Sequence, residues 1–274
     1  MANRSYVSLT ELKDSLGITS STDDKVLLNA IQGATLEIEK YCGRKFSVEH
    51  ATRYFEGDNR LWIGEILSVS TLKLDEDGNA SFETVATTSD YNLLPFNSFP
   101  KTYIEIADTS ELGTFAKGVK KGVEIVGEWG YGDGESASSF TAQSTMTAST
   151  ASGATTINVV STNLAAGQTW LIDSEQMYVK DLSASVASVI CGLNGTSKDA
   201  HSASSVIYVY DYPSDIKQAC LNLSTALYNN RTKQGLQSES IGDYSYVMAG
   251  TTLRKNVVES ILDDTIHTYK KVRV

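Results

Sequence analysis

Two amphipathic segments, one near each end of the chain, constrain the fold most. Apolar side chains recur in both at steps of three and four residues, which predicts two helices with one apolar face each. Each large side chain on such a face contributes roughly 1.5–3 kcal/mol when it is buried, so neither helix is stable alone in water. We therefore expect the two helices to share one core. The apolar positions are Leu27, Ala30, Ile31, Ala34, Ile38 and Tyr41 in the first, and Ile216, Ala219, Cys220, Leu223, Ala226 and Leu227 in the second.

Capping residues mark the ends of the predicted helices. Asp23 and Asp24 stand at the start of the first amphipathic segment, where the helix dipole favours negative charge, and Gly43 follows its last turn. The same signals predict a short helix within 8–17 and a last helix within 253–269.

Two blocks of β-type alternation lie between the helices. The first block, 52–131, includes the hairpin-type dipeptide Asp77-Gly78 and predicts a compact β layer. The second block, 154–212, is dense in β-branched and aromatic residues and includes the turn dipeptide Asn194-Gly195. The serine- and glycine-rich stretch 133–140 separates the blocks and is typical of a flexible linker.

These patterns predict an α+β protein of two domains. Residues 1–134 and 211–274 are expected to form a helical-bundle core with a small β layer, and residues 141–210 an inserted, small all-β domain. Loop-closure entropy grows by only about 0.6 kcal/mol for each doubling of length, so a folded insert costs little where its ends lie close together.

Charge and composition exclude several classes of protein. The formal net charge is −10, and it is divided as −7 over 1–132, −4 over 133–210 and +1 over 211–274. A surface that neutralises nucleic-acid phosphates needs clustered Lys and Arg, which this distribution does not provide. The sequence has no apolar run long enough for a signal peptide or a membrane span, so we expect a soluble protein without a membrane partner.

No motif indicates catalysis, a cofactor or a metal. His50, His201 and His267 are isolated in sequence, and the "DEDG" segment at 75–78 fits a solvated turn better than a calcium loop. The three cysteines are far apart and show no CxxC spacing. Nucleophile-elbow, P-loop and dinucleotide-binding motifs are absent, so the sequence predicts no enzyme.

An ordered series of segments resembles the head–tail connector, or adaptor, proteins of long-tailed bacteriophages and related prophages. The series includes a helix that ends in Tyr-Cys-Gly-Arg, an aromatic strand, a Trp-Gly-Tyr strand and a helix with Pro-x-Asp-Ile-Lys-Gln-Ala. In many relatives the Trp-Gly-Tyr strand runs almost directly into that proline, so the resemblance does not cover 133–210. The segments are "YVSLTELKDSLGI", "DDKVLLNAIQGATLEIEKYCGRKF", "TRYFEG", "SVSTLKLDEDG", "DYNLLP", "GEWGYG" and "PSDIKQACLNLSTALYNNR", followed by the closing helix.

The resemblance implies a structural virion protein that is assembled in the host bacterial cytoplasm and lies at the head–tail interface. Such proteins form a ring, typically of twelve copies, beneath the portal protein. The ring extends the DNA channel and offers a docking face for a stopper or tail completion protein. DNA would pass through without specific binding, so we expect an acidic or neutral lumen.

The same resemblance implies that the end of the chain reaches the portal. Lys270, Lys271 and Arg273 form the one basic cluster, which could equally complement a helix dipole. Tyr244 and Tyr246, in a predicted loop over 233–252, are further candidates for this interface, with a plain surface loop as the alternative.

A second class of function stays open at this point, namely recognition of a glycan or a surface by the β module 141–210. Aromatic rings stack on sugars, and four are available there, although strand alternation directs most of them into a small core. In the connector interpretation the insert would instead decorate the outside of the ring. The four are Trp170, Tyr178, Tyr208 and Tyr210.

Overall fold

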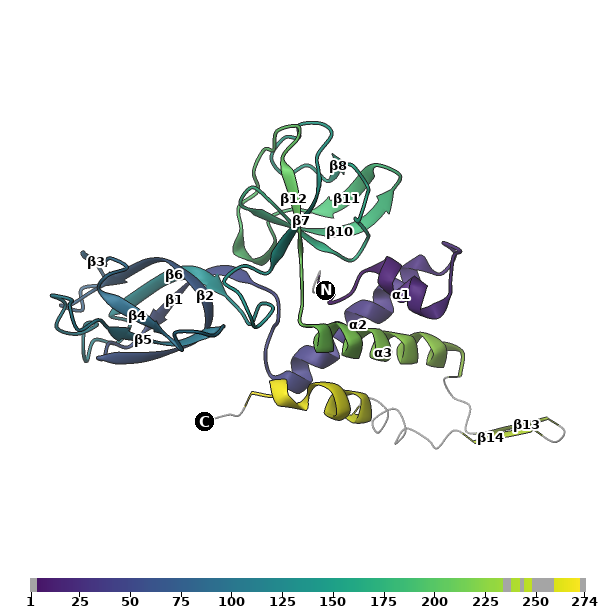
Figure 1. The fold of residues 1–274 in the computed structure, drawn as a ribbon, viewed down its shortest axis with the longest axis horizontal. Coiled ribbons are helices and arrows are strands. Elements are labelled where there is room, and N and C mark those ends of the chain that lie inside the picture. Colours follow the sequence, from purple (N-terminus) through teal and green to yellow (C-terminus); the bar gives the residue numbers. More distant parts are fainter. Residues whose placement is uncertain (1–3, 234–237, 242–243, 248–258, 272–274) are drawn as a thin grey trace. The chain divides into compact units, whose positions relative to one another are not determined.

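The computed structural model describes residues 4–233, 238–241, 244–247 and 259–271, with the backbone alone for 232–233, 238–241 and 244–247 (Figure 1). The chain divides into two compact units. We call Met1–Arg44, Ala142–Cys191 and Lys198–Val274 the helix–barrel unit, and Lys45–Thr141 with Gly192–Ser197 the β unit. Helices and antiparallel sheets are both present, which confirms the predicted α+β class.

Helix α1 (Leu9–Leu16) begins and ends where the sequence predicted. Its N-terminus is a capping box, because the Glu11 amide donates to the Ser8 hydroxyl and the Ser8 amide donates to the Glu11 carboxylate. Gly17 ends the helix with a φ of 66°, a left-handed conformation that costs a glycine little.

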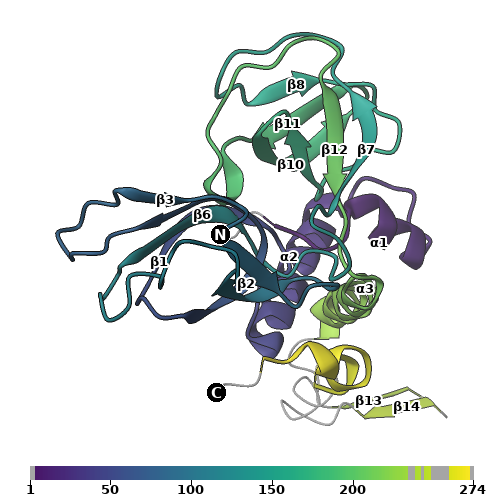
Figure 2. The same ribbon diagram turned by 60° about the vertical axis from the view of Figure 1, so that its left-hand side comes forward.

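Helices α2 (Asp24–Cys42) and α3 (Ser214–Asn229) pack side by side, as Figures 1 and 2 both show. Gly33 faces the Leu227 side chain closely, and Thr35 Oγ1 lies 3.7 Å from Cys220 Sγ. The two apolar stripes therefore share one core, as predicted. A last helical segment, 259–266, continues into η3 (His267–Tyr269) and buries Leu262 and Ile266.

The second β block folds into a closed barrel. Its strands are β7 (Phe140–Thr145), β8 (Thr156–Asn158), β9 (Thr169–Ile172), β10 (Glu175–Ser183), β11 (Val186–Ile190) and β12 (Val206–Tyr210), in the order β7-β12-β9-β10-β11-β8. A bridge between Met146 and Val159 joins the two end strands, so the sheet closes on itself (Figure 2). Trp170 is fully buried in the barrel core.

The barrel is fastened to the helices of its own unit. The Tyr178 hydroxyl lies 3.0 Å from Ser5 Oγ and accepts a hydrogen bond of 2.9 Å from Gln32 Nε2. The Leu9 amide donates to the Ala166 carbonyl at 2.9 Å. The division into a core, 1–134 with 211–274, and an inserted domain, 141–210, stays a prediction.

The β unit contains β1 (Glu49–Phe55), β2 (Arg60–Leu74), β3 (Thr84–Ala86), β4 (Tyr91–Leu94), β5 (Lys101–Ile106) and β6 (Val123–Trp129). All pairs are antiparallel, in the order β1-β6-β2-β5-β4, with β3 on β2. Strand β2 changes partner along its length: its first part pairs with β5 and its second part with β6 and β3. Leu61 and Ile104 from the first group and Leu72 and Ile125 from the second enter one core.

Two loops of the β unit are ordered by aspartates. The Asp75 carboxylate accepts hydrogen bonds from the amides of Gly78, Asn79 and Ala80, which shapes the connection between β2 and β3. The serine-rich stretch, predicted as a flexible linker, is a hydrogen-bonded turn in which the Asp133 amide donates to the buried Ser139 hydroxyl. Small side chains that accept and donate locally replace the missing apolar contacts there.

The dipeptide Asn194-Gly195, predicted to form a turn, lies in η1 (Leu193–Gly195), where both residues have positive φ. Within the predicted loop 233–252, following η2 (Asn230–Lys233), the backbone forms a short antiparallel hairpin of β13 (Ser238–Ile241) and β14 (Tyr244–Val247). Among the described residues, no helix combines the length and the apolar character needed to cross a bilayer.

Candidate functional site

The described part of the predicted basic cluster lies against the C-terminal end of α2. The Lys271 amide donates to the Cys42 carbonyl at 2.8 Å, and Lys270 Nζ lies 4.8 Å from the centroid of the Tyr41 ring. The last carbonyls of a helix have no partner within it, so the Lys271 amide satisfies one of them. The contact anchors the end of the described chain to the first amphipathic helix.

A second contact holds the same segment. The Tyr41 hydroxyl donates to the Asp263 carboxylate. Burial, together with the hydrogen bond and negative charge of Asp263, raises the pKa of Tyr41 to about 12. The phenol therefore stays protonated, and able to donate, well above neutral pH.

The remaining predicted interface residues are not placed in the same way. Tyr244 and Tyr246 lie in β14, opposite Ile241 and Glu239, but their side chains are outside the described residues. Arg273 is outside them altogether. The interface role of all five predicted residues stays a prediction.

The β unit displays the most exposed large hydrophobic side chains of the described chain. Phe96 is 63% exposed, Trp62 62%, Val85 59% and Tyr54 48%. The sequence analysis did not single these residues out. The signal was present in the run Leu61-Trp62-Ile63, where alternation on a strand directs Trp62 away from a core that receives its two neighbours.

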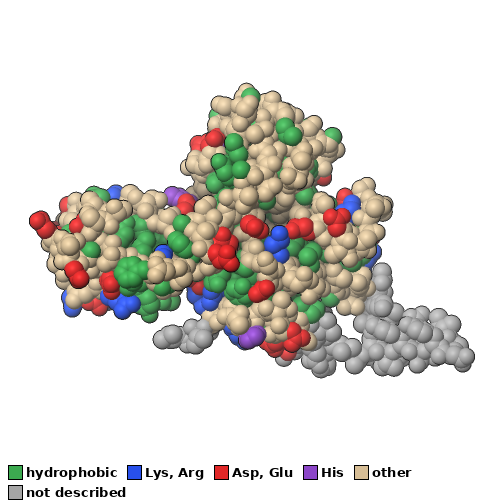
Figure 3. Space-filling view, in the orientation of Figure 1, with side chains coloured by type: hydrophobic (Ala, Val, Ile, Leu, Met, Phe, Trp, Pro, Cys, Tyr) green, Lys and Arg blue, Asp and Glu red, His purple; other side chains and the backbone are tan. Residues whose placement is uncertain are grey.

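One exposed group, which we call the Trp62 face, consists of Arg60, Trp62, Leu94 and Tyr103, with Phe96 in the loop that follows β4. Tyr103 lies directly opposite Trp62 on one side and Leu94 on the other, so the three form a cross-strand row. The Arg60 guanidinium stacks 4.5 Å from the centroid of the Tyr103 ring. Figure 3 shows hydrophobic side chains gathered over β4 and β5, the strands that carry part of this face.

A second group, which we call the Val85 face, crosses β1, β6, β2 and β3. It consists of Tyr54, Lys73, Phe82, Val85 and Glu124. Glu124 lies opposite Tyr54 and opposite Lys73, and Lys73 lies opposite Val85. The Tyr54 hydroxyl donates to Glu124 at 3.1 Å, and Lys73 Nζ lies 3.7 Å from the same carboxylate. Phe82 extends the row, with its ring centroid 5.8 Å from that of Tyr54.

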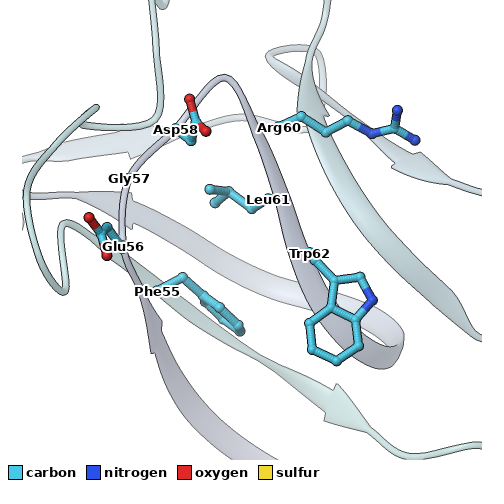
Figure 4. Close-up of a pocket in the computed structure, with 7 residues that line it drawn as sticks. All are labelled: Phe55, Glu56, Gly57, Asp58, Arg60, Leu61 and Trp62. Atoms are coloured by element: carbon cyan, nitrogen blue, oxygen red, sulfur yellow. The ribbon is translucent and has the colours of Figure 1, made fainter. Parts of the chain in front are cut away.

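A shallow pocket of about 350 Å³ lies at the turn between β1 and β2, beside the Trp62 face (Figure 4). Phe55 and Leu61 point into the space enclosed by the turn, whereas Arg60 projects away from it. Gly57 is required at the back of the turn, because a Cβ there would lie 1.9 Å from the Ala116 carbonyl oxygen. The pocket brings no set of catalytic groups together.

The barrel holds a buried charged cluster that sequence reasoning missed. His201 Nδ1 lies 2.7 Å from Asp173 and Nε2 lies 2.9 Å from Glu175, which is fully buried. Burial alone would lower the pKa of His201, but the hydrogen bonds and charges of the two carboxylates outweigh it and raise the pKa. His201 and Glu175 are buried, whereas the Asp173 side chain is 56% exposed, and the three side chains have the contacts of a structural ion-pair network.

The acidic loop after β2 brings Asp75, Asp77 and Glu83 together, with one carboxylate oxygen of each within 4.8 Å of the others. Asp75 directs its oxygens to backbone amides, in keeping with the turn predicted for "DEDG". These hydrogen bonds hold the Asp75 carboxylate in the turn.

Three of the four aromatic side chains considered for glycan recognition are buried. Trp170 is in the barrel core, where its indole donates to Gln168, and Tyr178 is fastened to the helices. Tyr210 stacks on Tyr212 with their ring centroids 4.5 Å apart. Only Tyr208 of the four is exposed, and one ring does not make a stacking platform.

Comparison with known proteins gives one family. Residues 6–108 match the model of the phage gp6-like head-tail connector protein family. No curated protein matches the chain. A solved structure described as the neck of an empty GTA particle computed with C6 symmetry contains a similar chain, with 14% identity, a TM-score of 0.37, and coverage of 98% of this chain and 91% of the other.

Proposed function

Because residues 6–108 belong to the phage gp6-like head-tail connector protein family, we propose that this chain is a structural virion protein of the head–tail interface. It assembles in the bacterial cytoplasm into a ring, of twelve copies, beneath the portal protein. The ring extends the DNA channel and offers its far side to a stopper or tail completion protein. A ring of identical copies needs a heterologous contact whose rotation closes.

The observation that carries this proposal is the family match, which spans α1, α2 and the strands from β1 to β5. The resemblance in the sequence also covers α3, and α3 packs on α2. The family is a structural, non-enzymatic one, in agreement with the prediction that the chain is not an enzyme.

The charge of the chain suits a channel through which DNA slides. Lysines and arginines that neutralise phosphates would hold the genome in place, since each phosphate contact strengthens binding. The net charge of −10 provides no such surplus. The proposal therefore includes an acidic or neutral lumen and no specific DNA binding.

The C-terminal segment is the proposed contact with the portal. Its position is fixed by the Tyr41–Asp263 and Lys271–Cys42 hydrogen bonds, while the Lys270 side chain is exposed. An anchored segment loses less conformational entropy on binding than a free one. Tyr244 and Tyr246 are proposed to belong to the same interface.

Electron microscopy of the purified chain, alone and mixed with the portal protein of the same particle, tests the proposal. We expect rings seated coaxially on the portal in the mixture. A chain that stays free of the portal at every ratio, or that binds it without forming a ring, would contradict the proposal. The chain alone serves as the control, because rings that need the portal as a template appear only in the mixture.

A further inference from the structure

We propose that the β unit carries both halves of the contact between neighbouring copies of this chain, with the Trp62 face of one copy bound to the Val85 face of the next. This inference rests on the ring proposed above and names the surfaces that build it. Four observations support it.

The first observation is the concentration of exposed apolar surface. The four most exposed large hydrophobic side chains of the described residues all belong to the β unit; Tyr54 and Val85 stand at the two ends of the Val85 face, with Glu124 and Lys73 between them. Scattered exposed hydrophobic residues are ordinary, whereas contiguous patches mark interaction sites in soluble proteins. Trp and Tyr are also the residue types that contribute most often to binding hot spots.

The second observation is that the Trp62 face is held in place before binding. Lys101 is buried at the base of β5, and its ammonium donates to the carbonyls of Pro95 and Phe96 at 2.7 and 2.8 Å. These bonds fix the loop that presents the Phe96 ring. Because an ordered surface loses little entropy on binding, the arrangement favours association.

The third observation is geometric. Residues of the Trp62 face alternate with Leu61 and Ile104, and residues of the Val85 face alternate with Leu72 and Ile125; all four of those neighbours enter the same core. The two faces therefore point away from the same core. The Trp62 face lies on β4, β5 and the first part of β2, and the Val85 face lies on β1, β3, β6 and the second part of β2. Two different faces on one rigid body give a head-to-tail contact, which is the kind that closes into a ring.

The fourth observation is charge complementarity. On the Trp62 face, Arg60 is more than half exposed, and its ion pair with Glu105 is a long one of 3.8 Å. Beside the Val85 face, the carboxylates of Asp77 and Glu83 receive hydrogen bonds from Asn79, and no Lys or Arg among the described residues pairs with either. A guanidinium from the next copy would relieve the repulsion within this acidic pair.

A charge exchange tests the contact in the full-length chain. Arg60→Glu places a negative charge on the Trp62 face where it would meet Asp77 and Glu83, and Asp77→Arg with Glu83→Arg places positive charges where they would meet Arg60. We expect each variant alone to self-associate at least about tenfold more weakly than the natural chain in sedimentation velocity. An equimolar mixture restores association to within roughly threefold, because each unlike pair of faces is complementary.

Lys45→Glu is the matched control, since Lys45 is an exposed lysine of the β unit that pairs with Glu49, a residue of neither face. Circular dichroism and thermal unfolding establish that every variant folds. Association that is unchanged in the single variants, or that the mixture does not restore, would overturn the inference. If the natural chain associates only in the presence of the portal, the same comparison is made on rings formed with the portal. Rings on the portal with all variants would leave the proposed function standing while the inference fails.

Discussion

The barrel and the β unit are both six-stranded antiparallel sheets, yet they use their aromatic side chains in opposite ways. In the barrel, the bridge from Met146 to Val159 joins the end strands, and Trp170 fills the interior. In the β unit, β1 and β4 remain the ends of the sheet order, and Trp62 faces outward.

This difference indicates that the barrel has a structural role and that the β unit contacts neighbouring copies of the chain. Closure removes the unpaired edges of a sheet, and a filled interior leaves little apolar surface for a partner. The barrel also directs Tyr178 to its own helices. The β unit keeps exposed aromatic rows, so we assign the contact between copies to it.

The two tryptophans give the largest contrast. Trp170→Ala empties a fully buried site, and we expect it to lower the free energy of unfolding by about 3–5 kcal/mol. Trp62→Ala removes a side chain that is 62% exposed, so it should change that free energy by no more than about 0.5 kcal/mol while weakening self-association. Denaturant titrations of both variants measure the two changes in the free energy of unfolding. Equal losses in the two variants would contradict the contrast between the barrel and the β unit.

The next largest effect on the free energy of unfolding is expected at His201 and Glu175 in the barrel. His201→Gln leaves the buried Glu175 carboxylate without its cation, so we expect a loss of about 3 kcal/mol at pH 6. The folded state raises the pKa of His201 above the ordinary value of 6.5. Its contribution to stability is therefore complete below pH 6.5 and is lost as the pH rises through the folded-state pKa.

Unfolding of the natural chain and of His201→Gln, compared from pH 6 to alkaline pH, checks this sign. The two stability curves should converge as the pH rises. Glu175→Gln keeps the shape of the side chain and serves as the matched variant, with a weaker pH dependence than the natural chain. Curves that stay parallel at all pH values would show that His201 is not held as a cation.

A smaller effect is expected where the β unit holds its exposed loop. Lys101→Met leaves the carbonyls of Pro95 and Phe96 without their donor, at a cost of roughly 1–3 kcal/mol. Self-association should weaken as well, because Phe96 is no longer held. Lys117→Met, at an exposed lysine, is the control, and a Lys101→Met chain that associates normally would remove the argument from preorganisation.

Removal of 268–274 should have the smallest effect on stability. It deletes the Lys271–Cys42 hydrogen bond, the Lys270–Tyr41 contact and the long hydrogen bond of 3.5 Å from the Tyr269 hydroxyl to Asp215, all near the surface, at a cost of about 1 kcal/mol. The fold should remain intact while the affinity for the portal falls. Binding of the truncated chain to immobilised portal measures this, and an unchanged affinity would refute the proposed role of the C-terminal segment.

The local features of this fold could be predicted from the sequence. Ser8 and Gly17 bound α1 because the cap chemistry is contained in a few neighbouring residues. The apolar stripes of α2 and α3 predicted that the two helices pack on each other, because each stripe is stable only when it is buried against another apolar surface. Periodicity also indicated the strands of both β blocks.

Features that depend on distant pairing could not be predicted. His201 and Glu175 are 26 residues apart, and nothing in that spacing indicates that the barrel brings them within 2.9 Å. Tyr178 alternates like a barrel residue, yet it binds Ser5, 173 positions away. The outward direction of Trp62 was predictable from alternation, but its place in a row with Tyr103 required the register of β2 and β5.

A reconstruction of the neck of the intact particle, at a resolution that traces strands, tests the central claim most directly. The account predicts a closed ring of this chain between portal and tail, in which neighbouring copies meet through the Trp62 and Val85 faces of their β units. A ring whose copies meet through the barrels, with both faces open to solvent, would contradict it, as would a neck without this chain.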